Sequence, residues 1–183
     1  HYSLSTAWDV STASSVTSIS LNHGGNIGGL KFKPDGTKFY ICEASSNSQV
    51  HEWGLSTAWD LTTRTYNGAL TPSQDVGYEG IAFNADGTQI FLCSDNNNTI
   101  YRYDMTTAYD ITSATYSGVN LSSGIQNNSQ GPNDITFENN GQYMFLLGKF
   151  STPKGVQRYS TGSVNFGTST TWNNATTNDE FYA

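Results

Sequence analysis

The segment Gly29–Asp60 reads GLKFKPDGTKFYICEASSNSQVHEWGLSTAWD, and it decides the fold because the chain repeats it. A second copy, Gly80–Asp110, reads GIAFNADGTQIFLCSDNNNTIYRYDMTTAYD. A third copy, Asp134–Thr161, reads DITFENNGQYMFLLGKFSTPKGVQRYST, and the end of the unit also stands alone at Leu4–Asp9 as LSTAWD. The first two copies start 51 residues apart. A period near 50 residues predicts a repeat architecture.

Each unit has the pattern of four short antiparallel strands. It opens with alternating apolar residues such as Leu30 and Phe32, which is typical of a half-buried strand. Asp35-Gly36 or its equivalent then predicts a tight hairpin turn, since these residues accept positive φ. The second, third and fourth strands of the first unit are expected at 38–42, 50–53 and 62–69.

The predicted fold is therefore all-β, a β-propeller of four-stranded antiparallel blades, with about three blades in this chain. We expect one domain over 1–183, divided into an end of a preceding blade or closing strand (1–22), blades at 23–73, 74–123 and 124–161, and an irregular tail or last strand (162–183). An ordinary β-sandwich would not explain such similar copies. Since a closed ring needs at least about four blades, we expect part of a larger propeller or half of a dimeric six-bladed ring.

Composition excludes several classes of function. The net charge of −7, with only 8 Lys and Arg, argues against nucleic-acid binding, which needs clustered cations. No apolar run is long enough for membrane insertion. Cys42 and Cys93 occupy equivalent positions in two units where the third has Leu147, which predicts core packing instead of a disulfide or metal site. No metal or other cofactor is expected.

The motifs Phe32–Tyr40 (FKPDGTKFY) and Trp53–Asp60 (WGLSTAWD) resemble a repeat of bacteriophage tail-fibre and other virion proteins, many of them marine. The repeat also occurs in some secreted bacterial proteins. The third unit departs from it, because Asn140 replaces the turn Asp and LSTAWD is absent after Tyr159. The resemblance implies a virion or extracellular location. It also implies contact with a host surface or with other virion subunits, including further copies of this chain.

Two groups of residues are candidates for ligand binding. The segments before each first strand differ between copies and would ring one mouth of a propeller channel; they contribute Asn26, Tyr78, Glu79, Asn133 and Asp134. The repeated aromatic residues Trp8, Trp59 and Tyr109 stand in turn-like segments, where a ring packs against the blade or stacks on a sugar. Packing is also an explanation for the aromatics, and unconstrained loops for the variable segments.

These residues support three functional hypotheses. The first is a non-enzymatic module for structural assembly or surface attachment, because no catalytic motif is visible among the histidines or in any nucleophile pattern. The second is a carbohydrate-binding, receptor-recognising module that uses the rim segments and the repeated aromatics. The third is a polysaccharide hydrolase or lyase, in which Glu79, Asp75 and Asp134 would converge near the channel mouth and two of them would act as a carboxylate pair.

Overall fold

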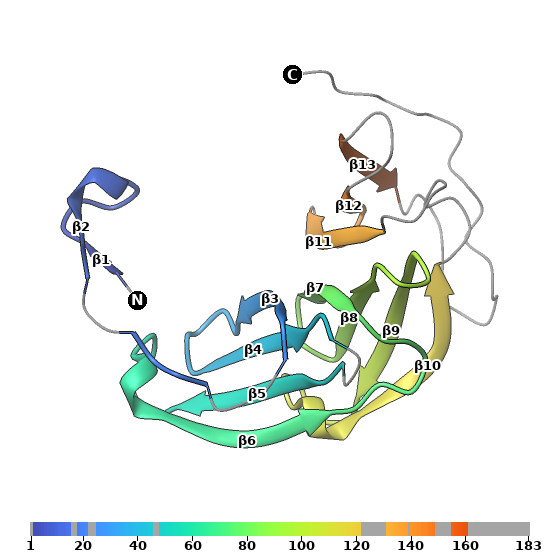
Figure 1. Cartoon of the computed structure of the whole chain (residues 1–183), viewed down its shortest axis with the longest axis horizontal. Coiled ribbons are helices and arrows are strands. Elements are labelled where there is room, and N and C mark those ends of the chain that lie inside the picture. The colour runs from blue at the N-terminus through green and yellow to red at the C-terminus, as the bar shows by residue number, and fades with distance from the viewer. Residues whose placement is uncertain are drawn as a thin grey trace.

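The computed structural model describes residues 2–15, 18–21, 25–45, 48–121, 131–138, 140–148 and 155–160. In these residues the regular elements are antiparallel strands and short 3-10 helices. The strands form four separate sheets, which follow one another along an open arc with the N-terminal sheet at one end and β11–β13 at the other (Figure 1). The tail at 162–183 lies outside the described residues.

Two sheets are complete blades. The first contains β3 (Ile27–Phe32), β4 (Lys38–Glu43), β5 (Val50–Leu55) and β6 (Arg64–Leu70), and the second β7 (Tyr78–Phe83), β8 (Gln89–Ser94), β9 (Thr99–Met105) and β10 (Ala114–Leu121). Each is a meander in which neighbouring strands pair antiparallel. The first strands, β3 and β7, lie beside each other on the inner side of the arc (Figure 1). This arrangement confirms the predicted β-propeller blades.

Two further sheets contain parts of blades. β11 (Pro132–Glu138), β12 (Tyr143–Gly148) and β13 (Gly155–Ser160) correspond to the first three strands of the unit. β1 (Tyr2–Leu4) and β2 (Ala13–Ser15) correspond to the third and fourth strands. Within the described residues β1 and β2 pair only with each other, and they lie at the opposite end of the arc from β13 (Figure 1). We refer to residues 2–15 as the N-terminal half-blade.

The expected start of the fourth strand was wrong by a few residues. A 3-10 helix precedes that strand in each unit: η1 (Val10–Thr12), η2 (Leu61–Thr63) and η3 (Ile111–Ser113). The helix forms because the preceding Asp side chain accepts a hydrogen bond from the backbone two residues later, which caps its first turn. The strands β6 and β10 therefore begin at Arg64 and Ala114.

The core lies between the blades. One apolar cluster joins the first blade (Tyr40, Cys42) to the second (Ile81, Leu92), and another joins the second blade to β11 and β12. A third cluster covers the face of the first blade that points away from the second. Each blade thus needs a neighbour on both faces to bury its alternating apolar residues.

Candidate functional site

The repeated aromatic residues share a left-handed backbone conformation. Trp8, Trp59 and Tyr109 have φ values of 68°, 66° and 58°, which is costly for a residue with a side chain. In the first complete blade the N–H of Trp59 donates to the carbonyl oxygen of Gly36 at 2.9 Å. The Trp59 ring covers that glycine so closely that a Cβ atom on it would lie 2.2 Å from the ring.

Tyr109 repeats this arrangement in the second blade. Its N–H donates to the carbonyl oxygen of Gly87 at 2.8 Å, and its ring lies over the same glycine. One face of each ring is therefore used for packing inside its own blade. Trp59 as a whole is about half-exposed, whereas Trp8 is almost fully exposed. We refer to this arrangement of an aromatic ring over the turn glycine as the glycine lid.

The Asp that follows each aromatic residue organises the next turn. Asp60 accepts hydrogen bonds from the backbone N–H of Thr62 at 2.9 Å and from its hydroxyl at 2.7 Å. Asp9 and Asp110 make the same pair of bonds to Ser11 and Thr112. The hydroxyl donor, together with the backbone N–H, lowers the pKa of Asp9 and Asp60. These carboxylates serve as caps in the scaffold.

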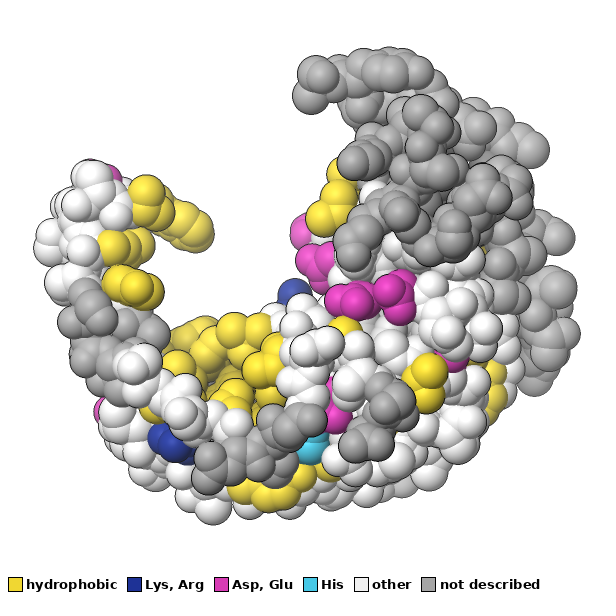
Figure 2. Space-filling model, viewed as in Figure 1, with side chains coloured by type: hydrophobic (Ala, Val, Ile, Leu, Met, Phe, Trp, Pro, Cys, Tyr) yellow, Lys and Arg dark blue, Asp and Glu magenta, His cyan; other side chains and the backbone are white. Residues whose placement is uncertain are grey.

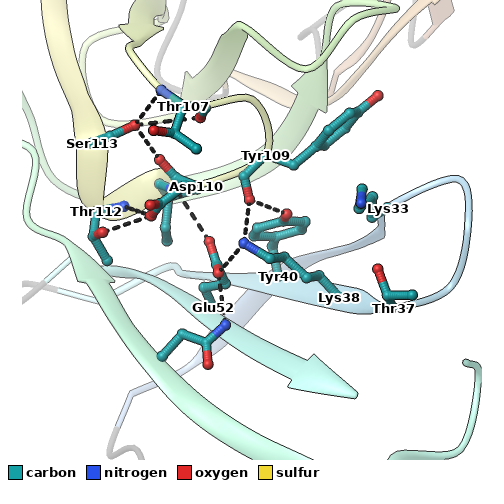
Figure 3. A network of polar contacts seen from close by, with 12 residues as sticks. Lys33, Thr37, Lys38, Tyr40, Glu52, Thr107, Tyr109, Asp110, Thr112 and Ser113 are labelled. Carbon is teal, nitrogen blue, oxygen red and sulfur yellow. Dashed lines mark hydrogen bonds and ion pairs between the residues drawn. The ribbon is translucent and has the colours of Figure 1, made fainter. Parts of the chain in front are cut away.

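A buried polar network connects the two complete blades (Figure 3). The Glu52 carboxylate, from β5, forms an ion pair with the Lys38 ammonium at 2.6 Å and accepts a hydrogen bond from the Asn67 amide at 2.8 Å. Its second oxygen accepts from the backbone N–H of Ile111 in the next blade at 3.0 Å. Glu52 thus contacts residues of both blades, and its side chain is 1% exposed.

The same network holds the glycine lid of the second blade. Lys38 Nζ and the Tyr40 hydroxyl both donate to the carbonyl oxygen of Tyr109, at 2.9 and 2.7 Å. Burial raises the pKa of Tyr40 well above its usual value, so the hydroxyl remains a donor. We refer to Lys38, Tyr40, Glu52 and their partners as the inter-blade clamp.

The inter-blade clamp could not be predicted from the repeat, because its residues do not recur in the second unit. The equivalents of Lys38 and Glu52 in the second unit are Gln89 and Arg102. There the Arg102 Nε pairs with Asp104 at 3.2 Å, within its own blade. A deviation from the repeat at two positions on neighbouring strands was the available signal.

The predicted rim residues differ in their exposure to solvent. Asn26 and Asp134 are exposed, and Glu79 and Asn133 are partly buried. Tyr78 is fully buried in the cluster between the first and second blades, so it is part of the core. Neighbouring rim segments do come together, since a Cβ atom on Gly80 would lie 2.8 Å from Asp134 Cα. The inner side of the arc therefore carries Glu79 and Asp134 close to the boundary between β7 and β11.

Asp75, the third carboxylate of the hydrolase hypothesis, is held in a separate network. It accepts hydrogen bonds from the Asn96 amide at 2.9 Å, from the Val76 N–H at 2.8 Å and from the Tyr101 hydroxyl at 3.4 Å. A nearly buried carboxylate with three donors is suited to holding a loop.

The cysteines pack in the core, as expected. Cys42 and Cys93 are free and fully buried, each at a different blade boundary. Burial raises the pKa of Cys42 to about 12 and raises that of Cys93 well above its usual value. Leu147, their equivalent in β12, is about half exposed. Among the described residues no cluster of His, Cys, Asp and Glu could hold a metal ion, and no helix is long and apolar enough to cross a membrane.

Comparison with known proteins supports the fold. No protein-family model and no curated protein sequence matches the chain. A solved protein from Lactobacillus plantarum is similar with a TM-score of 0.56 at 16% identity, over 84% of this chain and 49% of its own. A functionally unknown protein from Desulfotomaculum acetoxidans has a TM-score of 0.54 at 12% identity, over 73% of this chain and 39% of its own.

Hydrazine synthase from Kuenenia stuttgartiensis is similar with a TM-score of 0.52 at 17% identity, over 80% of this chain and 37% of its own. The chain thus spans less than half the length of each of these three structures. At such identities the likeness concerns the fold alone.

Proposed function

We propose that this chain is a non-enzymatic β-propeller module of a virion or an extracellular protein, which joins protein subunits or attaches to a surface. The observation that carries the proposal is the apolar surface at the N-terminal end of the arc. Tyr2, Leu4, Trp8 and Val10 of the half-blade are exposed there, and so are Ile27 and Leu30 of β3. Large exposed apolar residues gathered at one end of a fold mark interaction sites.

The resemblance to tail-fibre and secreted repeats supports the location outside the cell. The neutral-polar composition, with only 13% charged residues, is in keeping with it. Of the three predicted catalytic carboxylates, Asp75 gives the enzyme hypothesis little support, since it is bound by three donors inside a loop network.

Fractionation of the source culture tests this proposal. An antibody raised against residues 48–121 should detect the protein in purified particles or in the medium, and chemical cross-linking there should join it to other proteins. Detection confined to the cytosolic fraction would contradict the proposed location. Turnover of a polysaccharide by the purified chain, abolished by Glu79→Gln, would contradict the non-enzymatic role.

A second function is favoured by the half-exposed ring of Trp59. A half-exposed aromatic ring is suited to stacking on a sugar, and the contact with Gly36 fixes the position of the Trp59 ring. A glycan array should then show binding that Trp59→Tyr retains and Trp59→Ala removes. A blank array with the folded chain would exclude this carbohydrate-binding role.

A further inference from the structure

We propose that the Asn67-Gly68 pair of β6 is a site of spontaneous deamidation in the folded chain, and that the reaction opens the inter-blade clamp. Asn67 supplies the amide that donates to the Glu52 carboxylate at 2.8 Å. Conversion of this amide to an acid replaces a hydrogen-bond donor of the clamp by a second carboxylate. The reagent is water, so the site needs no enzyme and no partner chain. The inference is independent of the location and role proposed above.

The chain contains two Asn-Gly pairs, which stand in different surroundings. A glycine after an asparagine favours deamidation, because no side chain shields the backbone nitrogen that attacks the amide carbon. Asn140-Gly141 lies in the turn between β11 and β12, where the Gly141 N–H donates to the carbonyl oxygen of Glu138 at 3.1 Å. The attacking nitrogen of that pair is therefore already held. Asn67-Gly68 instead lies within a strand, and its backbone surroundings decide its reactivity.

Asn67 is the extra residue of a β-bulge. Its neighbours Tyr66 and Gly68 pair with consecutive residues of β5, so Asn67 has no partner of its own on that strand. Within the described residues β6 is also the last strand of its sheet, so sheet pairing holds its backbone on one side only. The strand runs along the outer, convex margin of the arc (Figure 1), which Figure 2 shows uncovered in this view. A bulge on an edge strand locally disrupts the ladder, which gives this segment the freedom that the attack requires.

The contact with the next blade requires the glycine. Gly68 has a φ of 143°, and a Cβ atom there would lie 2.9 Å from the Thr112 Cγ2 atom of η3. The second blade has Ser117-Gly118 at the equivalent position, where the Ser117 hydroxyl donates to the carbonyl oxygen of Arg102 at 2.8 Å. Of the two complete blades, only the first has an asparagine there, and the clamp uses its amide. The clamp and the blade contact thus together place an asparagine before a glycine.

The reaction balances with water alone. The Gly68 nitrogen attacks the amide carbon Cγ of Asn67, and a cyclic imide forms as the Cγ–Nδ2 bond breaks. Nδ2 leaves as ammonia, which carries away the proton of the attacking nitrogen. Water then adds to either carbonyl carbon of the imide and breaks its bond to nitrogen. The products are aspartate or isoaspartate at position 67, and the isoaspartate carries an additional methylene group in the main chain.

Either product disrupts the clamp. The Glu52 oxygen that accepts from Asn67 also pairs with the Lys38 ammonium at 2.6 Å, so one cation would have to serve two neighbouring carboxylates. The longer main chain of isoaspartate also displaces Gly68 relative to η3, at a contact that leaves no room for a Cβ atom. The second oxygen of Glu52 then holds the Ile111 N–H less firmly, and the boundary between the two complete blades loosens.

Ageing of the purified chain tests the site. The folded protein is incubated at mildly alkaline pH, and fragmentation mass spectrometry follows the conversion of each asparagine to aspartate and isoaspartate. Position 67 should convert within about tenfold of its rate in the same chain unfolded by denaturant, as suits a segment that opens at little cost. Asn84 and Asn120, which precede residues with side chains, are the internal references and should remain amides. An amide at position 67 that persists in the folded chain, while the unfolded chain is converted, would overturn the proposal.

Hydrogen exchange at the Ile111 N–H, followed by NMR, tests the effect on the clamp. In the converted fraction of aged protein this proton should exchange about tenfold faster than in fresh protein. Asn67→Ser is the matched control, because serine stands at the equivalent position of the second blade and cannot deamidate. Ageing should leave exchange in Asn67→Ser unchanged. Equal acceleration in both proteins, or none in wild-type chain that has been converted at position 67, would overturn the link between deamidation and the clamp.

Discussion

Glu52 of the first complete blade accepts a hydrogen bond from the backbone N–H of Ile111 in the second, at 3.0 Å, and both residues are buried. The N–H opens the 3-10 helix η3, so it has no partner inside that helix. Glu52 therefore satisfies a helix end in a neighbouring blade while its other oxygen is paired with Lys38. This single carboxylate fixes the position of one blade relative to the next.

Removal of the clamp cation should destabilise the chain strongly. Lys38→Met leaves the Glu52 carboxylate buried with two neutral donors, and breaking a buried ion pair costs about 3–5 kcal/mol. Since the Lys38 side chain is itself 25% exposed, we expect the lower end of that range, about 3 kcal/mol. The measurement is the free energy of unfolding in denaturant.

Gln89→Met is the matched control, because Gln89 occupies the equivalent position in the second blade and its side-chain amide donates to the partly exposed Asp104, at 3.3 Å. It should cost less than about 1 kcal/mol. The double variant Lys38→Met with Glu52→Gln should recover part of the loss. Equal effects of Lys38→Met and Gln89→Met would show that the clamp does not stabilise the blade boundary.

Gly36→Ala should disrupt the glycine lid. Gly36 has φ of 73°, and a Cβ atom there would meet the Trp59 ring at 2.2 Å. Gly118→Ala is the control, because Gly118 has φ of 80° and nothing lies within 4 Å of its Cβ position. The control should lose about 1–2 kcal/mol from the left-handed conformation alone, and Gly36→Ala about 2 kcal/mol more. Similar losses for the two variants would show that the ring moves aside without cost.

The repeat made the blades predictable from the sequence. Alternating residues such as Leu30 and Phe32, followed by Asp35-Gly36, locate a hairpin whatever surrounds it, and β3 and β4 lie there. The structural role of the LSTAWD motif was harder to predict from the sequence. Trp59 follows Gly36 by 23 residues, so the contact between ring and glycine depends on how the third strand returns past the turn.

The residues that join blades could not be predicted from one unit. Tyr78 looked like a rim residue because it stands before a first strand, but the preceding blade covers it. Leu147 shares a position with Cys42 and Cys93 and yet is half-exposed, since burial there depends on the following blade. A repeat pattern reports the fold of each unit, whereas the surfaces between units depend on which neighbours are present.

The two cysteines should resist modification in the folded chain. Burial disfavours the thiolate and raises the pKa of Cys42 to about 12. At about pH 8 a thiol reagent therefore cannot reach the buried sulfur atom, which is also protonated and so a poor nucleophile. Both thiols should react promptly once denaturant unfolds the chain. Leu147→Cys is the control, because its side chain is half-exposed and should react in the native state. Rapid labelling of Cys42 or Cys93 under native conditions would contradict their burial.

The capping carboxylates should make stability depend on pH in the acid range. The hydroxyl and backbone N–H of Thr62 lower the pKa of Asp60 below its ordinary value of 3.8 in the folded state. The contribution of Asp60 to stability is therefore complete above about pH 4 and is lost as the pH falls through the lower, folded-state pKa. Asp60→Asn keeps an acceptor for the cap but cannot titrate.

The melting temperature of the wild-type chain should thus fall more steeply than that of Asp60→Asn between about pH 4 and pH 2. Thr62→Val provides the second test, since it removes the hydroxyl that contributes most to the lowered pKa and should reduce the pH dependence without removing the carboxylate. If the wild-type chain and Asp60→Asn lose stability in parallel over this range, the cap does not favour the ionised form of Asp60, and the acid sensitivity must come from other carboxylates, such as Asp35, whose pKa is also lowered by its bond with Lys33.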